Sequence, residues 1–459
     1  MKKKLNIGIL HYQVGHTDGV SLELEKWKKE FEKLGHSVFL CAGDLGSADG
    51  TLVEGMYHHI PEIERLTFNT FDTLCDFNLE EYSKEMHRWV HLLEHSFTEF
   101  ISEHKINFLV PQNVWSVAAN PAVGVALENV RRKFNLPALA HNHDFYWERK
   151  KISLTNTAVI EMMDKYYPPR DPLIKHVVIN SLAKKQLAER KGILSTVVPN
   201  VFNFDPPDWQ EDEFNSDFRS SIGLKENDLI ILQATRVVAR KGIELAIDFV
   251  KTLNSPDRRE LLIKNGLYNG KNFNHDSRIV LVLAGYGRDD ISGTYLKNLR
   301  IKARQEGVDM IHIEDRVSHE RKLNNGRKVY SLWDTYVFAD FVTYPSLWEG
   351  WGNQFLEAIK AKKPILLFEY PVYKADIKSK AFEVISLGSE TSGLDDLGLV
   401  QVHADIIETA ADQAVELLTN KKRRSQVVNH NFQIGKAHFS LDMLRNCLRN
   451  LLEDCVINE

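Results

Sequence analysis

The sequence predicts an α/β protein with two consecutive doubly wound halves, each built on a parallel sheet. Short apolar or β-branched runs alternate with longer segments of helical periodicity. A polar, proline-containing stretch at residues 205–223 interrupts this alternation, and a second series starts at residue 228. A closed barrel of α/β units is the alternative. The restart after a polar linker and the glycine-containing turns that begin each half favour two separate sheets.

The first half begins with a β-α-β unit. Residues 5–10 are an expected strand, residues 20–35 an amphipathic helix that ends at Gly35, and residues 36–43 the next strand. Further strands are expected at residues 106–112, 137–142 and 176–180. We assign the first domain to residues 1–204.

The second half repeats the pattern. Its expected strands lie at residues 228–237, 278–287, 309–315, 340–346 and 363–371. Helical patterns at residues 408–420 and 432–454 close the chain. We assign the second domain to residues 205–430, and a C-terminal helix to residues 431–459 that is expected to pack back on the first domain. Two such sheets that face each other form a cleft at the carboxyl ends of their strands, where ligands bind in open α/β sheets.

Composition excludes several classes of protein. The 459 residues are too many for one ordinary core, and the net charge of -5 carries no basic stripe for nucleic acid. No apolar run is long enough for a transmembrane helix, and the run after Met1 is too short for a signal peptide. Scattered cysteines without a CxxC pair indicate reduced thiols in a cytoplasmic protein and no zinc site: Cys41, Cys75, Cys447 and Cys455.

Two cations follow the first strand of the second half. Arg236 and Lys241 stand beside a strand-to-helix turn that contains Gly242. A guanidinium can bind a diphosphate bidentately, and an ammonium acts as a compact positive charge. The alternative is a pair of solvated loop cations.

The next strand runs into a Gly-x-Gly turn. Gly285 and Gly287 allow close approach of the backbone to a ligand or to a neighbouring loop, and a plain tight turn is the alternative. Asp289 and Asp290, which follow, could imitate a metal site, but helix capping is the better interpretation.

The segment PSLWEGWGNQFLEAIKAKKP at residues 345–364 carries two carboxylates. The loop ends at Gly352, and a helix is expected to begin near Asn353, where its N–H groups and dipole favour a phosphate. Glu357 lies about one turn inside this helix, where it could reach paired hydroxyls such as those of a ribose. Glu349 lies before the loop, closer to the group that the phosphate carries. The alternative is an amphipathic helix with Glu357 as a surface charge.

In order and spacing these motifs resemble the family 4 retaining glycosyltransferases of GT-B fold, the glycosyl transferases group 1. The resemblance runs from about residue 5 to about residue 370. Its motifs are a first turn at residues 16–38, a strand-end histidine in residues 136–148, a Pro-Asn in residues 197–204, Arg-x4-Lys-Gly, Gly-x-Gly and Glu-x7-Glu.

The resemblance implies roles for individual residues. Arg236 and Lys241 would hold the donor diphosphate, Glu357 the nucleotide ribose and Glu349 the donor sugar. His143 would lie near the reacting face of the sugar, with His141 as the fallback. Implied donor contacts also include Gly19, Gly285, Gly287, Gly350, Trp351, Gly352, Asn353 and Gln354. Asp18, His141 and Asp144 are the candidates on the acceptor side.

The sequence departs from the family pattern at three places. Asp18 precedes Gly19 where a pair of glycines is commoner, which makes Asp18 a candidate substrate contact. Trp351 stands where phenylalanine is common. Residues 319–340 form a longer and more polar lead-in than usual beside the expected site of the nucleotide base, which leaves the base preference open.

The implied reaction is transfer of a hexose from a nucleoside-diphosphate sugar to an acceptor hydroxyl with retention of configuration. Front-face attack would leave Glu349 without a nucleophilic role, and no metal or other cofactor is implied. A hinge near residues 200–210 would close the cleft over the substrates. A sugar-nucleotide epimerase, a phosphorylase and a catalytically silent paralogue acting as a partner subunit are the alternatives. The charged residues retained at the site argue against the silent paralogue.

The acceptor is expected to be a soluble small molecule or saccharide. The first helix has mixed charge rather than the basic face of a membrane-surface transferase. The DGVSLE turn and the segment at residues 369–377 are similar to those of enzymes that make mannosyl- or glucosyl-glycerate solutes. A lipid or polysaccharide acceptor remains the alternative.

Overall fold

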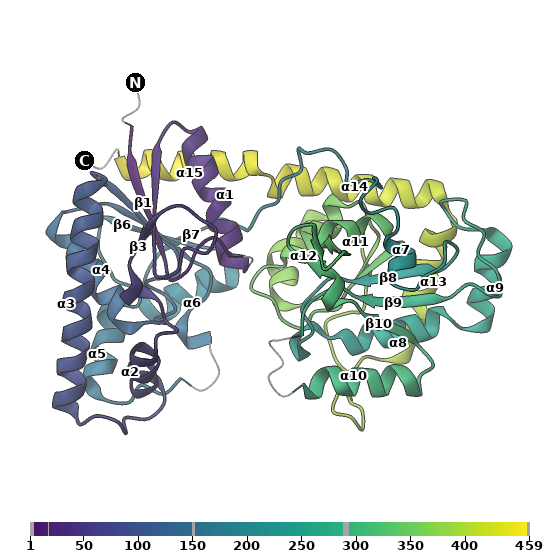
Figure 1. The fold of residues 1–459 in the computed structure, drawn as a ribbon, viewed down its shortest axis with the longest axis horizontal. Helices are drawn as coiled ribbons and strands as arrows, with labels where there is room; N and C mark the ends of the chain where they lie inside the picture. Colours follow the sequence, from purple (N-terminus) through teal and green to yellow (C-terminus); the bar gives the residue numbers. More distant parts are fainter. Residues whose placement is uncertain (1–3, 17, 149–151, 288–292, 457–459) are drawn as a thin grey trace. The chain divides into compact units, whose positions relative to one another are not determined.

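The computed structural model describes residues 4–16, 18–148, 152–287 and 293–456. The chain divides into two compact units: unit 1 is Met1–Val201 with Leu441–Glu459, and unit 2 is Phe202–Ser440. Each unit is Rossmann-like, with a parallel sheet and helices on both of its faces (Figure 1). The predicted fold class is therefore confirmed, and the single closed barrel is wrong because each sheet is open.

Unit 1 contains a seven-stranded parallel sheet in the order β3-β2-β1-β4-β5-β6-β7. The strand order reverses between β1 and β4, which lie side by side. Its strands are β1 (Asn6–His11), β2 (Ser37–Ala42), β3 (Thr51–Leu52), β4 (Phe108–Pro111), β5 (Ala138–Asn142), β6 (Ile174–Val178) and β7 (Ser195–Val197). The inner strands are apolar throughout, as expected where both faces of a sheet are covered.

Two helical layers enclose this sheet. One apolar cluster joins the sheet to α2, α3, α4 and α5, and another joins its opposite face to α1 and α15. The helices are α1 (Gly19–Lys33), α2 (Pro61–Phe71), α3 (Leu79–Glu103), α4 (Pro121–Lys133), α5 (Thr157–Tyr166), α6 (Ser181–Lys191) and α15 (Leu441–Val456), with 3-10 turns η1 (Glu54–Met56) and η2 (Tyr146–Glu148).

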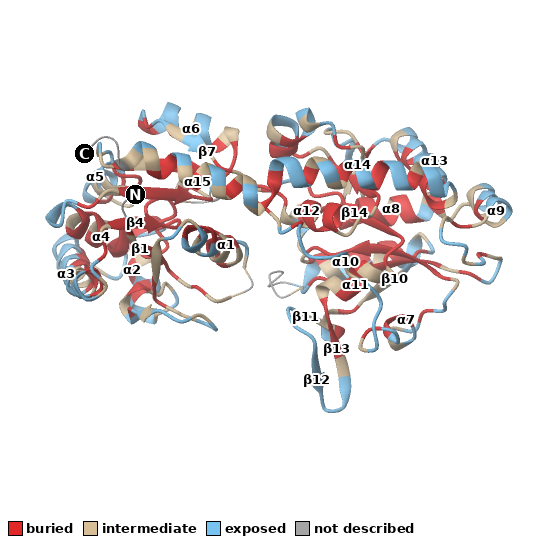
Figure 2. Ribbon diagram, turned by 90° about the horizontal axis from the view of Figure 1, so that it is seen from above, coloured by how far each residue is buried: buried red, intermediate tan, exposed pale blue. Residues whose placement is uncertain are grey.

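Unit 2 contains a six-stranded parallel sheet in the order β10-β9-β8-β14-β15-β16, and its order reverses between β8 and β14. These strands form the buried centre of the unit (Figure 2). They are β8 (Leu229–Gln233), β9 (Ile279–Leu283), β10 (Asp309–His312), β14 (Phe341–Tyr344), β15 (Ile365–Leu367) and β16 (Ile385–Ser386). Two small sheets add β11 (Val317–Ser318), β12 (Lys322–Asn324), β13 (Arg327–Ser331), β17 (Gly393–Leu394) and β18 (Val400–Gln401).

The helices of unit 2 pack on both faces of its main sheet. They are α7 (Phe218–Ser221), α8 (Ile243–Leu253), α9 (Pro256–Asn265), α10 (Thr294–Gln305), α11 (Leu332–Phe338), α12 (Asn353–Lys360), α13 (Ala404–Thr419) and α14 (Lys421–Phe439). Shorter turns are η3 (Ala239–Lys241), η4 (Glu314–Arg316), η5 (Tyr373–Ile377) and η6 (Lys378–Lys380). The polar lead-in at residues 319–340 folds into the β12–β13 hairpin and α11. Among the described residues, no helix is both long and apolar enough to cross a membrane.

The C-terminal helix differs from the prediction. Instead of one helix over residues 431–459, α14 ends at Phe439, Ser440 is extended with φ -88° and ψ 166°, and α15 begins at Leu441. The break has a tertiary cause, because the N–H of Phe202 donates to the carbonyl of Phe439 at 2.8 Å and Phe202 bridges Ser440. The chain therefore crosses between the units after Val201 and after Ser440, not after residues 204 and 430.

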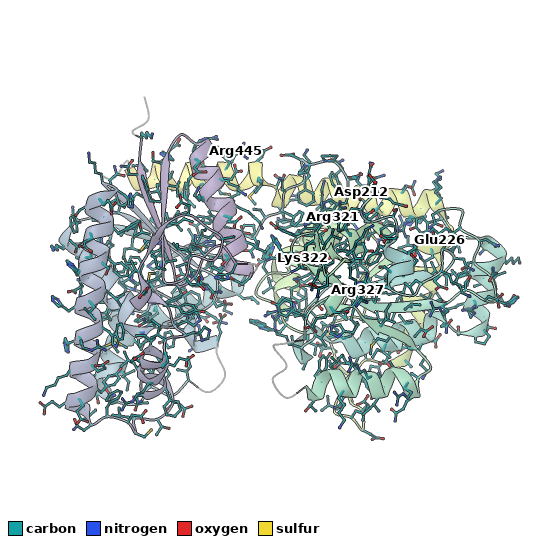
Figure 3. All side chains as sticks on the ribbon, in the orientation of Figure 1. Asp212, Glu226, Arg321, Lys322, Arg327 and Arg445 are labelled. Atoms are coloured by element: carbon teal, nitrogen blue, oxygen red, sulfur yellow. The ribbon has the colours of Figure 1, made fainter. Side chains whose placement is uncertain are left out.

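The helix α15 belongs to unit 1. Leu444, Leu448, Leu451 and Leu452 are buried in the same apolar cluster as α1. Arg445, labelled in Figure 3, places its Nε 2.6 Å from the Glu30 carboxylate of α1. Unit 1 is thus completed by a helix that follows unit 2 in the sequence.

Candidate functional site

The candidate site in unit 2 lies where the strand order reverses. Arg236 and Lys241 follow β8, and Glu349 follows β14, which is the neighbour of β8 in the sheet. Ligands of doubly wound sheets bind at this point, at the carboxyl ends of the strands. The fold therefore brings these three predicted residues to the same edge of the sheet.

Two cations hold the Glu349 carboxylate. Lys241 Nζ hydrogen-bonds to Oε1, and Arg240 donates to Oε2 at 2.9 Å and to the carbonyl of Trp348 at 3.2 Å. Lys241 is 2% exposed and Glu349 is 6% exposed. The interpretation of Lys241 as a solvated loop cation is therefore wrong. Arg240 was not predicted as a site residue, although it directly precedes Lys241 in the Arg-x4-Lys-Gly motif.

The carboxylate of Glu349 is charged. Burial by itself would raise its pKa, but attraction to Lys241 and Arg240 outweighs burial and holds the pKa below its usual value. Arg236 is close enough for its charge to act on Lys241. Arg240 and Lys241 contact the Glu349 carboxylate and Arg236 lies nearby, so a cationic group gathers at this edge of the sheet.

The loop before α12 depends on a glycine. Gly352 has φ +127°, and a Cβ atom there would lie 2.3 Å from the Tyr370 hydroxyl, which donates to the carbonyl of Trp351 at 2.8 Å. The helix α12 begins at Asn353, which confirms the predicted start. The Trp351 ring is buried and packs edge-on against Phe439 at 5.4 Å, so its side chain lies in the core of unit 2.

Glu357 is buried on α12. It is 8% exposed, and its Oε2 accepts a hydrogen bond from the Tyr336 hydroxyl of α11 at 3.0 Å. The interpretation of Glu357 as a surface charge is therefore wrong. Tyr336 was not predicted, because it lies on α11, which precedes β14 in the sequence, whereas Glu357 lies on α12, which follows β14.

The Gly-x-Gly turn packs against the end of β8. A Cβ atom on Gly285 would lie 1.9 Å from the carbonyl oxygen of Thr235, so a larger residue would push the two loops apart. The Gly285 carbonyl accepts from His312 at 2.8 Å, and the Gly287 N–H donates to Glu314 at 3.1 Å. Approach to a neighbouring loop is thus confirmed, and approach to a ligand stays a prediction.

A second group of predicted residues lies in unit 1, at the ends of β1, β4 and β5. Gln112 joins the predicted His143 to His11: its carbonyl accepts from His11 Nδ1 at 2.7 Å, and its side-chain oxygen lies 2.9 Å from His143 Nε2. Burial, helped by the nearby His11, lowers the pKa of His143 to about 3. His143 is therefore neutral near pH 7. His11 and Gln112 carried no sequence signal of their own.

His141 contacts both His143 and α1, and its ring centroid lies 4.1 Å from that of His143. Its ring stacks on Trp27 with centroids 4.0 Å apart, and neither ring nitrogen has a hydrogen-bond partner among the described residues. Burial lowers the pKa of His141 well below its usual value. Asp144 is half-buried just beyond β5. The two histidines therefore lie together at the end of β5, and His143 is the one whose ring contacts Gln112.

Asp18 is the N-cap of α1. Its Oδ1 accepts from the N–H groups of Val20 and Ser21 at 3.0 and 3.1 Å, and its Oδ2 accepts from Gln13 at 3.0 Å and from the Ser21 hydroxyl at 2.6 Å. Capping explains the departure from a glycine pair. Gly19, the first residue of α1, is exposed. A contact of Asp18 or Gly19 with substrate stays a prediction.

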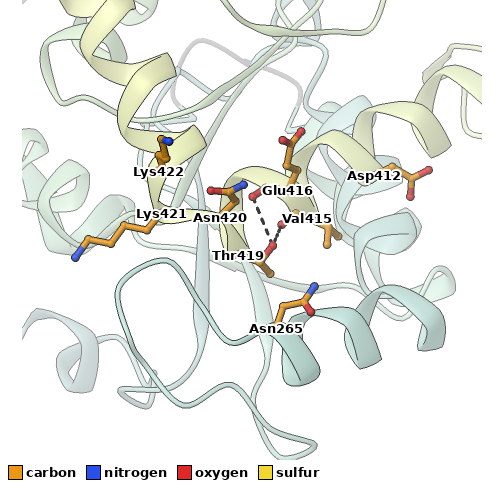
Figure 4. Close-up of a pocket in the computed structure, with 8 residues that line it drawn as sticks. All are labelled: Asn265, Asp412, Val415, Glu416, Thr419, Asn420, Lys421 and Lys422. Atoms are coloured by element: carbon orange, nitrogen blue, oxygen red, sulfur yellow. Dashed lines mark hydrogen bonds between the residues drawn. The ribbon is translucent and has the colours of Figure 1, made fainter.

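Other potential sites lie apart from these groups. A surface hollow between α9, α13 and the start of α14 contains none of the predicted residues (Figure 4). It is lined by Asn265, Asp412, Val415, Glu416, Thr419, Asn420, Lys421 and Lys422. Within the part of the chain that the structure describes, no three His, Cys, Asp or Glu residues gather to hold a metal ion. Asp289 and Asp290 fall outside that part.

Comparison with known proteins identifies the family. Residues 214–381 match the glycosyl transferases group 1. Mannosylglucosylglycerate synthase of Petrotoga mobilis is 36% identical over 445 residues, 96% of this chain and 100% of the relative. The synthase of the same name from Thermotoga maritima is 37% identical over 449 residues, 97% of this chain and 99% of the relative.

Solved structures agree at the level of the fold. The structure of Anabaena HepE in complex with UDP and glucose superposes with a TM-score of 0.57 at 12% identity, covering 98% of this chain and 99% of that one. The topology is that of the GT-B glycosyltransferases. With a family match in unit 2 and curated relatives that align along nearly the whole chain, this protein belongs to the glycosyl transferases group 1 and is a glycosyltransferase.

Proposed function

We propose that this enzyme transfers a mannosyl group from a nucleoside-diphosphate donor to a hydroxyl of glucosylglycerate, with retention of configuration and without a metal ion. The observation that carries the donor assignment is the cationic group around Glu349 in unit 2. The names of the two relatives, which align along nearly the full length of the chain, support the acceptor and the sugar. The UDP and glucose bound to Anabaena HepE support a nucleotide-sugar donor.

The charges in unit 2 suit a diphosphate leaving group. Negative charge grows on the phosphate oxygen as the glycosidic bond breaks, and fixed cations stabilise that charge. Arg240 and Lys241, which contact Glu349, and the nearby Arg236 supply the cations of this group. The start of α12 adds the positive end of a helix dipole. These groups would compensate the leaving-group charge without a metal ion.

The same contacts favour front-face attack over double displacement. A double displacement requires a free carboxylate under the opposite face of the sugar ring. Both oxygens of Glu349 are bound by cations on the phosphate side, which suits contact with sugar hydroxyls better than nucleophilic attack. In the front-face scheme the departing phosphate oxygen takes the proton of the acceptor. His143, buried and neutral, would orient the sugar or acceptor by hydrogen bonding.

Both proposed substrates are soluble and charged, which supports a reaction in the cytoplasm. The experiment is an assay of nucleoside diphosphate release with mannose and glucose linked to GDP, UDP or ADP. Each donor is tested alone, with glucosylglycerate, and with glycerate or glucose as incomplete acceptors. We expect release only with a mannosyl donor and glucosylglycerate together, a product with retained configuration by NMR, and unchanged activity in EDTA.

Three other outcomes would contradict the proposal. Release or isomerisation of the donor without an acceptor would indicate a hydrolase or an epimerase. Phosphate-dependent cleavage of the proposed product, mannosylated glucosylglycerate, would indicate a phosphorylase. If the protein folds normally but releases no nucleoside diphosphate from any donor, it would be a catalytically silent partner subunit. As a control, Arg236→Ala should lower turnover by about a hundredfold while the fold is kept.

A further inference from the structure

Tyr336 is a buried side chain with one polar contact that the reaction scheme does not use. Its residue is 0% exposed, and its hydroxyl donates to Oε2 of Glu357 at 3.0 Å. The two side chains come from α11 and α12, which flank β14 in the sequence. The hydroxyl therefore fixes one oxygen of the carboxylate from a neighbouring helix.

Two tryptophans hold the Tyr336 ring. Trp209 and Trp333 stack on each other with centroids 4.5 Å apart and an angle of 20°. The Tyr336 ring lies 5.9 Å from Trp209 and 6.3 Å from Trp333, inclined by 37° and 27°. Such packing leaves the phenol ring one orientation, and its hydroxyl one direction.

Polar contacts also hold α11, the helix that carries Tyr336. Ser331 and Asp334 form a capping box at its start. The Asp334 carboxylate also accepts from Asn215 at 2.8 Å and from Arg321 NH2 at 2.5 Å. Arg321, labelled in Figure 3 with Asp212, bonds to that second aspartate at 2.7 Å. The position of the Tyr336 hydroxyl is thus supported by polar contacts that run from the buried Asp334 to the exposed Arg321 and Asp212.

We infer that Tyr336 is a positioning residue that orients Glu357 toward the two ribose hydroxyls of the nucleotide, an inference that rests on the proposed donor. An ionised carboxylate offers about four lone-pair sites on its two oxygens. Tyr336 occupies one of the sites on Oε2 and prevents rotation of the group. A carboxylate held in one orientation can accept from two neighbouring hydroxyls, which is the geometry that a ribose diol presents.

Loss of the Tyr336 hydroxyl should therefore weaken ribose recognition rather than turnover. A ligand that lacks a hydroxyl hydrogen-bonded to a charged group binds roughly one to two orders of magnitude more weakly than the ligand that has it. We expect the wild-type enzyme to prefer the active mannosyl donor over its 2′-deoxy- and 3′-deoxyribose analogues by about 10- to 100-fold in kcat/KM. In Tyr336→Phe this preference should fall to within a few-fold, mainly through KM for the natural donor.

The experiment compares this preference in four proteins: wild type, Tyr336→Phe, Glu357→Gln and the control Tyr330→Phe. Tyr330 is equally buried in unit 2, and its hydroxyl donates to Asp217 at 2.9 Å, so the control removes the same kind of bond elsewhere. The preference is a ratio within each protein, so a smaller folded fraction cancels out. We expect Tyr336→Phe and Glu357→Gln to lose the preference and Tyr330→Phe to keep it.

Three results would overturn the inference, each in a different way. If Glu357→Gln loses the preference while Tyr336→Phe keeps it, Tyr336 has no positioning role and the ribose contact of Glu357 stands. If Glu357→Gln also keeps a strong preference, Glu357 does not bind the ribose and the donor assignment itself is wrong at this residue. A loss of preference in Tyr330→Phe as well would mean that any weakening of unit 2 has this effect, which would also refute a specific role.

Discussion

Replacement of Glu349 by glutamine removes the carboxylate that Lys241 and Arg240 contact, while nearly preserving the shape of the side chain. Lys241, 2% exposed, would then lie buried without its carboxylate partner. Arg240 would lose the same partner, but its side chain is 34% exposed and water can replace the contact. The cost therefore falls mainly on Lys241.

Breaking a buried ion pair by removal of one partner costs about 3–5 kcal/mol. The exposed Arg240 adds no more than about 1 kcal/mol. For a unit of this size, 1 kcal/mol corresponds to about 2–4 °C in Tm, so Glu349→Gln should lower the Tm of unit 2 by about 6–20 °C. Lys241→Met should cost less, because Glu349 keeps Arg240. The double variant should be more stable than the sum of the two losses predicts, by about 0.5–3 kcal/mol.

Calorimetry of the four proteins measures these losses, and titration with nucleoside diphosphate tests the charge argument. With the carboxylate gone, the charges of Lys241 and Arg240 act on the ligand without opposition from Glu349. Glu349→Gln should therefore bind the diphosphate at least as tightly as the wild type, although turnover is lost. Additive losses of stability, or diphosphate binding that disappears with Glu349, would refute the reasoning.

Three further predictions concern stability and the loop before α12. Leu448→Ala, at a 0% exposed position of α15, should cost unit 1 about 2–5 kcal/mol by urea denaturation, whereas the exposed Asn450→Ala should cost almost nothing. Burial lowers the pKa of His143 to about 3 and that of His176 to about 4, from the usual 6.5. As the pH falls below 6.5, both histidines are therefore protonated in the unfolded chain while they stay neutral in the folded one. Each histidine should thus remove about 1.4 kcal/mol from the stability of unit 1 per pH unit below 6.5, and a Tm of unit 1 that is unchanged between pH 7 and 5 would contradict this. Gly352→Ala, strained at φ +127° and crowded by a hydroxyl, should lower kcat/KM at least about tenfold, and wild-type kinetics would show that the loop tolerates a side chain.

Local sequence patterns were sufficient for the two α/β series and most of their elements. The helix predicted at residues 20–35 corresponds to α1, and the helix predicted near Asn353 begins there. The short edge strands β3 and β7 were not predicted, because runs of two or three residues carry no periodicity. Strand order was also beyond local patterns, since it depends on pairing between distant segments.

The sequence was sufficient to predict several residues of the candidate site, but not the contacts between them. The sequence singled out Lys241 and Glu349, but their direct pairing depends on the neighbouring positions of β8 and β14. Tyr336 reaches Glu357 across 21 positions and two helices, which no spacing rule detects. The break at Ser440 was missed for the same reason, because helical periodicity continues through it and only the distant Phe202 interrupts the helix.

The return of α15 to unit 1 also has a consequence during protein synthesis. Domains generally fold from the N-terminus as the ribosome releases them. Here the leucines that complete the first sheet's apolar layer are made only after the whole of unit 2. The apolar residues of α1 that pack against α15 therefore stay uncovered until the end of synthesis, whereas unit 2 is continuous in the sequence.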